Sequence, residues 1–339
     1  MKTTDHIIRR TATVATMSIG ILLALGFSVW MFGALAYDGP GAVTGGITMA
    51  LLLGFMVHMK FRRRAWIVWV VCMAVGLIWW LALKPPADAD WQRDVAKLAT
   101  AEVDGDIVTF RNVRDFKYRS EEDYDPHWIT RRVRFSSLTG VDIAINYWGS
   151  PWMAHPIVSF HFSDSPPLAF SIETRKRAGQ SYSAIGGLYR QFPLICIVAE
   201  EQDILALRAV YRKDEDVYLY RTTLPAEHAR TRLLEYVNTI NTLSHHPRWY
   251  NAITTNCTTA IRSQDHDGDR IPWDWRILVN GKGDEMMFEI GKFQTDGLDF
   301  AQLKRRAHAN AAIIAANGKP DFSARIRAAT LPNQAPIKP

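Results

Sequence analysis

The chain has 339 residues, of which 48% are hydrophobic and 22% are charged, so its composition excludes a collagen-like or a wholly disordered protein. The net charge of +6 comes entirely from residues 1–84. This segment holds eight of the 40 basic residues and two of the 34 acidic ones, which leaves 32 of each sign in residues 85–339. The balanced remainder gives no electrostatic reason to expect nucleic acid as a partner.

Three uncharged stretches follow one another near the N-terminus: residues 14–36, 42–59 and 65–83. A helix of about 20 apolar residues crosses the roughly 30 Å hydrocarbon core of a bilayer, so we expect residues 1–84 to form a membrane anchor with three transmembrane helices. A cleavable signal peptide is an alternative for the first stretch, but its apolar region has only about 7 to 15 residues. A pair of buried core helices is a second alternative, which apolar residues on every face disfavour.

Basic residues indicate how the anchor is oriented, because Lys and Arg collect in cytoplasmic loops. Lys2, Arg9 and Arg10 precede the first stretch, and residues 62–64 are three consecutive arginines between the second and the third. We therefore expect an inner (cytoplasmic) membrane protein with a cytoplasmic N-terminus. The residues after Lys84 then lie in the periplasm, and membrane lipid is an expected partner.

The remaining chain is divided by composition. Residues 85–104, which begin with two prolines, are expected to be a linker. Residues 105–318 are expected to form one periplasmic domain. Residues 319–339 are polar and rich in proline, which predicts a flexible tail.

The expected domain is of the α+β class with a mostly antiparallel sheet, since its strands come before its helices without strict alternation. Runs rich in β-branched and aromatic residues predict strands at 107–111, 141–147, 157–162, 168–174, 194–199, 204–211 and 217–221. The turn residues 163–166 predict that two of these strands, 157–162 and 168–174, pair as a hairpin. Apolar spacings of three and four predict a helix over 225–244, and a last helix is expected over 303–316.

The three cysteines differ in their surroundings. Cys72 lies in the third apolar stretch, and Cys196 lies in an apolar strand, where an inert core thiol is the plain interpretation. Cys257 lies in a polar stretch at an expected helix start, where backbone N–H groups favour the thiolate. Cys257 is therefore the candidate nucleophile. A disulfide between Cys196 and Cys257 is the structural alternative.

A thiolate nucleophile needs a base, which is usually histidine at neutral pH. His155 and His161 lie on or beside one predicted strand and, being six residues apart, share a face. His266 follows Cys257 in an acidic loop that departs from the calcium-loop pattern, so a solvated turn is the simpler interpretation. No cofactor or metal is expected.

Several longer motifs resemble the Lnb N-terminal periplasmic domain family. They are WGSPWMAHPIVSF (148–160), FSIETR (170–175), GQSYS (179–183), DVYLY (216–220) and WYN running into TTNCTT (249–259). The resemblance covers about residues 105–310. It relates the chain to the lipoprotein intramolecular transacylase, which moves an acyl chain from the diacylglyceryl group of a lipoprotein to its N-terminal amine through a cysteine and a histidine.

The resemblance implies that Cys257 and His155 are the catalytic pair. Histidine precedes cysteine here, which is similar to the permuted papain-like order of the NlpC/P60-like thiol enzymes. A symmetric hairpin turn would place Glu173 or Thr174 opposite His155 or Pro156, so that Glu173 could orient the imidazole. The alternative for Glu173 is a surface carboxylate paired with a neighbouring arginine.

Asn256 and Ser159, together with Ser171 and Tyr182, are further candidates for supporting the site or an oxyanion, although each could be an ordinary turn or strand hydrogen-bonder. Three hypotheses follow. The first is an acyl-transfer enzyme acting on lipoprotein or lipid acyl groups, and the second is a cell-wall peptidase or amidase acting on peptidoglycan. The third is a non-enzymatic envelope scaffold or binding protein, in which Cys257 would keep an ordinary thiol pKa near 8.5. The oligomeric state does not follow from the sequence.

Overall fold

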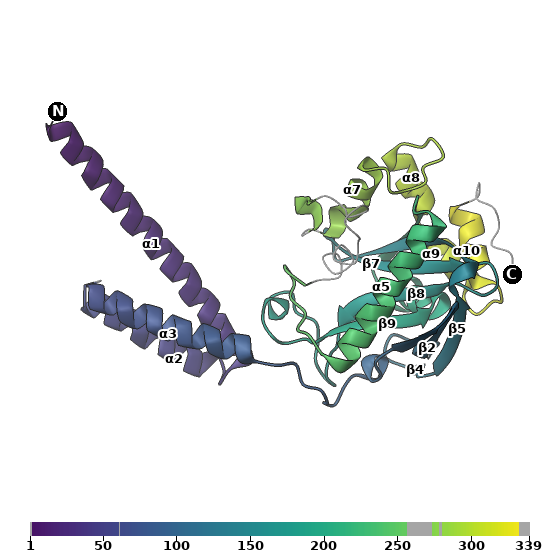
Figure 1. Ribbon diagram of the computed structural model, residues 1–339, viewed down its shortest axis with the longest axis horizontal. Helices are drawn as coiled ribbons and strands as arrows, with labels where there is room; N and C mark the ends of the chain where they lie inside the picture. Colours follow the sequence, from purple (N-terminus) through teal and green to yellow (C-terminus); the bar gives the residue numbers. More distant parts are fainter. Residues whose placement is uncertain (1, 61, 256–272, 278–279, 332–339) are drawn as a thin grey trace. The chain divides into compact units, whose positions relative to one another are not determined.

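The computed structural model describes residues 2–60, 62–255, 273–277 and 280–331. The chain divides into two compact units, and Figure 1 labels their helices and strands. The first unit consists of Met1–Pro85 and Tyr182–Phe192, and the second consists of Pro86–Ser181 and Pro193–Pro339.

The first unit contains three helices, α1 (Lys2–Asp38), α2 (Ala42–His58) and α3 (Arg63–Ala82). Two segments are long and apolar enough to cross a membrane, Ala15–Asp38 within α1 and the whole of α3. The prediction of three such helices is corrected to two. The helix α2 ends at His58 and has 17 residues, about 26 Å at 1.5 Å per residue, which is shorter than the hydrocarbon core of about 30 Å.

The helices α1 and α3 run in the same direction. Trp69 of α3 donates its indole N–H to Ser28 Oγ at 3.0 Å, and Trp80, further along α3, donates to Asp38 Oδ2 at the end of α1 at 2.8 Å. The helix α2 packs against α1. The contact is close, since a Cβ on Gly45 would lie 3.0 Å from α1. The polypeptide therefore runs in one direction along α1, in the opposite direction along α2 and in the first direction again along α3.

Residues 182–192 belong to this helical unit. The ring of Tyr189 is stacked on that of Tyr37 with centroids 5.0 Å apart, and Tyr189 is only 8% exposed. The backbone amide of Arg190 donates to Asp38 Oδ2 at 3.0 Å. This loop is thus held against the end of α1 by stacking and by hydrogen bonds.

The second unit is built on one eight-stranded sheet in the order β1-β2-β9-β8-β7-β6-β10, with β5 paired to β2 beside this path. All pairings are antiparallel except that of β2 with β9. The strands are β1 (Thr100–Asp104), β2 (Ile107–Arg114), β5 (Trp128–Arg134), β6 (Leu138–Trp148), β7 (Ser150–Phe162), β8 (Leu168–Thr174), β9 (Leu194–Glu200) and β10 (Glu215–Arg221). The strands β3 (Lys117–Tyr118) and β4 (Tyr124–Asp125) form a separate ribbon.

The main helical elements of this unit come after β9 in the chain, with β10 among them. They include α4 (Glu201–Ala206), the π-helical turn η4 (Leu207–Tyr211), α5 (Ala226–His245), η5 (Trp275–Ile277), η6 (Asn280–Lys282), α7 (Gly283–Glu289), α8 (Phe300–Ala307), α9 (Asn310–Ala316) and α10 (Phe322–Thr330). The α+β class and the mostly antiparallel sheet are confirmed. The hairpin of β7 and β8 and the helix after Pro225 also form as predicted.

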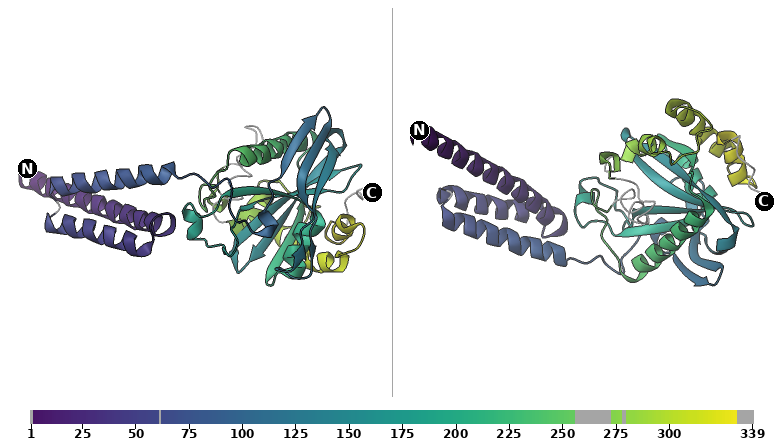
Figure 2. Two further views of the ribbon diagram at one scale, coloured as in Figure 1. Left: turned by 90° about the horizontal axis from the view of Figure 1, so that it is seen from below. Right: turned by 45° about the horizontal axis from the view of Figure 1, so that its top comes forward.

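Helices cover both faces of the sheet. Tyr236 of α5 packs on the rings of Phe160 and Phe170 on one face. On the other face Ile157 and its neighbours form a core with α4, η4, α9 and α10. The left view of Figure 2 shows α5 on one side of the strands and the yellow C-terminal helices on the other. Because strand residues alternate between faces, His155, Ile157, Ser159 and His161 all point to the second, helix-rich face.

Two predicted elements are wrong. Residues 204–211 were expected as a strand but form the end of α4 and η4. Residues 204–209 are all buried, and an apolar run buried on every side does not reveal its period. The single helix expected over 303–316 is two helices, α8 and α9, separated by His308 and Ala309.

The ordered domain extends beyond both expected boundaries. The strand β1 lies in the segment expected as a linker, and Val95 in the same segment is 1% exposed in the core. The helix α10 lies in the segment expected as a tail and buries Phe322 and Ile326. Apolar side chains that pack against the sheet thus order both segments.

Candidate functional site

His155 lies in the first half of β7, where the strand passes from exposed to buried residues. Its neighbours Trp152 and Met153 are exposed, whereas His155 is 8% exposed and points to the helix-rich face of the sheet. Asn146 of β6 lies directly beside His155 in the antiparallel register. The strand therefore holds His155 at the border of the core.

Two side chains of β8 meet the imidazole. The pairing of β7 with β8 ends at Ile157 and Ser171, and two residues beyond this pair on each strand lie His155 and Glu173. Nε2 of His155 lies 2.7 Å from Ser171 Oγ, and Ser171 Oγ donates to Glu173 Oε1 at 2.7 Å. The direct distance from His155 Nε2 to Glu173 Oε1 is 3.7 Å. A hydrogen-bonded chain thus runs from His155 through Ser171 to Glu173.

An arginine on η4 completes this group. Arg208 donates to Glu173 Oε1 at 2.9 Å, and its other terminal nitrogen lies 3.7 Å from Glu215. Burial alone would raise the pKa of Glu173, but Arg208 and the neighbouring positive groups hold it well below its usual range. Glu173 is therefore an ionised acceptor at neutral pH.

The hydrogen bonds from His155 to Ser171 and from Ser171 to Glu173 fix the tautomer of His155. The one hydroxyl proton of Ser171 goes to the Glu173 carboxylate, which has no proton to give back. The Ser171 oxygen then accepts the Nε2–H of His155, and the lone pair of the imidazole lies on Nδ1. Burial lowers the pKa of His155 to about 4, with Glu173 acting in the opposite direction. His155 is thus a neutral imidazole at pH 7 whose Nδ1 can accept a proton.

Ser159, predicted to support the site, belongs to a different cluster further along β7. Its hydroxyl donates to Glu201 Oε1, and Arg327 of α10 forms an ion pair with the same carboxylate at 2.5 Å. Arg327 also contacts Asp142 at 2.8 Å, and Nε2 of His161 lies 2.9 Å from Asp142. This buried cluster joins α10 to the sheet, and the side chain of Ile157 separates it from His155 along the strand.

The cysteines that the structure describes are not partners of His155. Cys196 carries a free thiol on β9. It is paired with Ile172 in the register, so it points to the opposite face of the sheet from Glu173. Burial raises the pKa of the Cys196 thiol, as expected of an inert core residue. Cys72 lies in α3. Cys257, Asn256 and His266 lie outside the described residues.

Sequence reasoning missed the linking role of Ser171 and the presence of Arg208. Ser171 and Glu173 are two residues apart on one strand and therefore share a face, a signal that was available. Arg208 lay in a segment expected as a strand, which gave no reason to place it near Glu173. Among the described residues, no group of three or more His, Cys, Asp and Glu side chains could hold a metal ion.

The family model described as Lnb N-terminal periplasmic domain matches residues 124–281, a range that includes His155, Ser171, Glu173 and Arg208. No curated protein and no solved structure matches the chain. The matched family indicates a periplasmic, envelope-associated protein, and with the apolar N-terminal helices it fits a membrane-anchored protein with a periplasmic domain.

Proposed function

We propose, on the premise that residues 124–281 belong to the Lnb N-terminal periplasmic domain family, that this chain is a membrane-anchored thiol enzyme of the acyl-transfer class. Cys257 is the proposed nucleophile and His155 the proposed base. The proposed substrate is an acyl group of a lipoprotein or a membrane lipid. A tether to the bilayer favours such a substrate because it keeps the domain close to the membrane surface.

The hydrogen bonds that link His155 through Ser171 to Glu173 are the observation on which this proposal rests. A base that serves a nucleophile is usually oriented by a third group on its other ring nitrogen. Here Ser171, which is itself bound to Glu173, occupies Nε2, and this leaves the Nδ1 lone pair for a thiol proton. The lowered pKa of His155 leaves this nitrogen unprotonated at neutral pH, where it can accept a proton as a weaker base than an unperturbed imidazole.

The proposed reaction has two steps. In the first, Sγ of Cys257 attacks the carbonyl carbon of an ester while the thiol proton passes to Nδ1 of His155. The bond from carbonyl carbon to alcohol oxygen breaks, the proton passes to that oxygen, and a thioester remains on Cys257. In the second step an amine attacks the thioester to form an amide. Its proton returns through His155 to the sulfur, which restores the free thiol.

A lipopeptide substrate tests the proposal directly. The full chain in detergent would be incubated with a diacylglyceryl lipopeptide that has a free N-terminal amine. Transfer leaves the total mass unchanged but moves one acyl chain onto the N-terminal fragment in tandem mass spectrometry. We expect Cys257→Ala to abolish transfer and His155→Ala to slow it about a hundredfold or more. Peptidoglycan stem peptides, tested in parallel, separate lipid chemistry from amidase chemistry.

Matched variants control for loss of a thiol or an imidazole in general. Cys72→Ala removes a thiol in α3, and His228→Ala removes a surface imidazole on α5, whose side chain is 45% exposed. Both should keep the activity of the unaltered chain. Undiminished labelling of Cys257→Ala by a thiol-reactive acyl probe would refute the proposed nucleophile. Transfer that is equally fast in His155→Ala and His228→Ala would refute the proposed base.

We also propose that the N-terminus is cytoplasmic and that the second unit is periplasmic, in the inner membrane. The parallel course of α1 and α3 supports this orientation, because the chain must recross between them. The return between them is made by α2, which at 17 residues is shorter than the two helices that pass the length test for a span. The arginines at 62–64 then lie on the cytoplasmic side, as the positive-inside rule expects.

Reporter fusions test this orientation. Alkaline phosphatase is active only in the periplasm, so fusions after Gly41 and after Pro85 should be active, and a fusion after Lys60 should be inactive. Activity after Lys60 together with inactivity after Pro85 would show that α2 does not cross.

A further inference from the structure

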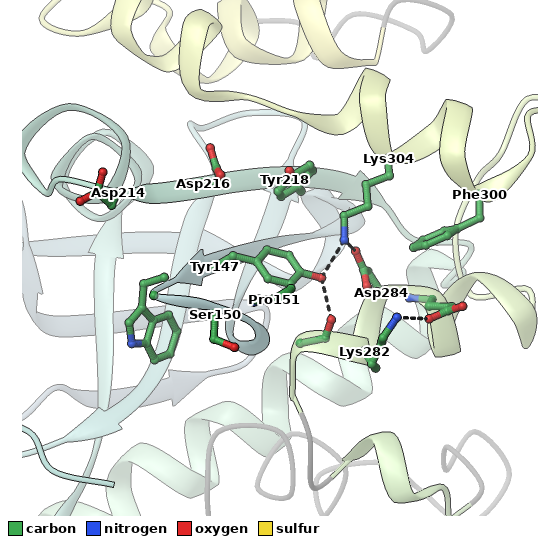
Figure 3. A pocket seen from close by; sticks show the side chains of 14 residues that line it. Tyr147, Ser150, Pro151, Asp214, Asp216, Tyr218, Lys282, Asp284, Phe300 and Lys304 are labelled. Carbon is green, nitrogen blue, oxygen red and sulfur yellow. Dashed lines mark hydrogen bonds and ion pairs between the residues drawn. The ribbon is translucent and has the colours of Figure 1, made fainter.

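The second unit contains a cavity of about 470 Å³ on the opposite face of the sheet from His155. It lies where the tip of the β6–β7 hairpin meets β10, η6 and α8, as Figure 3 shows. Tyr147 is next to Asn146 in β6 and so points away from the face that carries His155. The volume falls within the range of about 300 to 1,000 Å³ that is typical of small-molecule sites.

The ammonium groups at this cavity are already neutralised. Lys304 Nζ lies 2.7 Å from Asp284 Oδ2 and donates to Tyr147 Oη at 3.1 Å. Lys282 Nζ lies 3.1 Å from Glu285. In Figure 3 the two lysines enter from opposite sides, and each ends at its own carboxylate. A strongly anionic ligand would have to compete with these carboxylates.

The carboxylates give no strong site for a cation either. Asp284 is 1% exposed and is engaged by Lys304 and by the hydroxyl of Tyr220 at 3.2 Å. On the rim, Asp216 pairs with His308 at 2.9 Å. The remaining acidic group of the lining, Asp214, lies at an exposed turn, where water screens its charge.

Half-buried aromatic rings form the other part of the lining. Tyr147, Trp148, Tyr218 and Phe300 all contribute, and all four are neither fully buried nor fully exposed. Lys304 Nζ lies 4.4 Å from the centroid of the Tyr147 ring and 5.1 Å from that of Tyr218. The cavity therefore combines half-buried aromatic side chains with hydrogen-bonding groups. Both of its ammonium groups are paired with carboxylates, and its two further carboxylates, Asp214 and Asp216, are exposed.

We propose that this cavity is a binding site for a neutral carbohydrate, a short segment of an oligosaccharide. A pyranose ring has apolar C–H faces that pack on aromatic rings, and hydroxyl groups at its edge that donate and accept hydrogen bonds. Such a ligand can use the third N–H of Lys304, the hydroxyl of Ser150 and the carboxylate of Asp214 without breaking an ion pair. This site is separate from the proposed acyl-transfer chemistry and does not depend on it.

Four trisaccharide probes of different charge and substitution test the proposal. The full chain in lipid nanodiscs would be titrated calorimetrically at pH 7 with triacetylchitotriose and maltotriose, both neutral, and with the cationic chitosan trimer and anionic trigalacturonate. We expect at least one neutral sugar to bind more tightly than either charged one. The acetamido groups distinguish triacetylchitotriose from maltotriose, so the ratio of the two dissociation constants indicates the type of glycan recognised. Tighter binding of a charged probe, or no binding of either neutral sugar, would overturn the proposal.

Variants of the lining locate the binding. Trp148→Ala and Phe300→Ala each remove an aromatic face, and we expect each to raise the dissociation constant about tenfold. Trp273→Ala is the matched control, because Trp273 is 68% exposed and is not part of the lining. Asp214→Asn keeps an acceptor and a residue that tolerates the left-handed backbone (φ 59°), so it should change the constant less than about threefold. An equal effect of Trp148→Ala and Trp273→Ala would place the sugar elsewhere.

Discussion

Replacement of His155 should remove part of the pH dependence of folding. Burial lowers the pKa of His155 to about 4, whereas the ordinary value is 6.5. As the pH falls below 6.5, the unfolded chain binds a proton at this histidine and the folded chain does not. The free energy of unfolding therefore decreases, by about 1.4 kcal/mol for each pH unit and by about 3 kcal/mol in total when pH 4 is reached. Above pH 6.5 the contribution to stability is fully present.

The variant His155→Gln tests this reasoning. Unfolding of the full chain in detergent by urea would be followed by near-ultraviolet circular dichroism at pH 7.0 and pH 5.5. Over this interval we expect the variant to lose about 1.2 kcal/mol less stability than the unaltered chain. His161 is also buried with a lowered pKa and stays in both proteins, so only the difference between them is informative.

His228→Gln is the matched control, since His228 is a surface residue of α5. Its loss of stability between the two pH values is the reference for removal of an imidazole at the surface. If His155→Gln shows the same loss as His228→Gln, then His155 is protonated in the folded chain at pH 5.5. The argument from its burial would then be refuted.

Two further predictions concern packing. Arg327→Met should lower the free energy of unfolding by about 3 to 5 kcal/mol, because the arginine is 5% exposed and its buried carboxylate partners would lose a cation; the urea midpoint measures this loss. Gly33→Ala should displace Tyr189, whose hydroxyl oxygen lies 1.8 Å from the position of the added Cβ. Trypsin should then cleave at Arg190 faster than in Gly20→Ala, where an added Cβ meets nothing within 4 Å; equal cleavage rates would contradict the packing.

The neighbourhood of His155 could be predicted where local rules apply. The turn at residues 163–166 fixes the hairpin register, in which Ile157 pairs with Ser171, and counting two residues further on each strand leads to His155 and Glu173. The strand period also places Ser171 on the same face as Glu173, although it does not show that the serine lies between the two. Alternation and turn chemistry act over a few residues, which is why they can be read from the sequence.

Long-range contacts could not be predicted in this way. Arg327 meets Asp142 and Glu201 from a helix that the composition suggested was a tail, and no periodic pattern links residues so far apart. Arg208 reaches Glu173 from the π-helical turn at residues 207–211, in a segment that the sequence pattern predicted as a strand. The apolar run around Arg208 is compatible with strand or helix, and its packing between the sheet and α9 decides the outcome.

The packing of residues 182–192 with the helices has a practical consequence for isolating the second unit. The chain passes between the two units at three places, after Pro85, after Ser181 and after Phe192. A shortened protein that began at Pro86 would keep this loop but lose the Tyr37 ring on which Tyr189 stacks. The uncovered aromatic surface would then promote aggregation. A well-behaved soluble version would need a new, polar loop at this position as well as removal of the anchor.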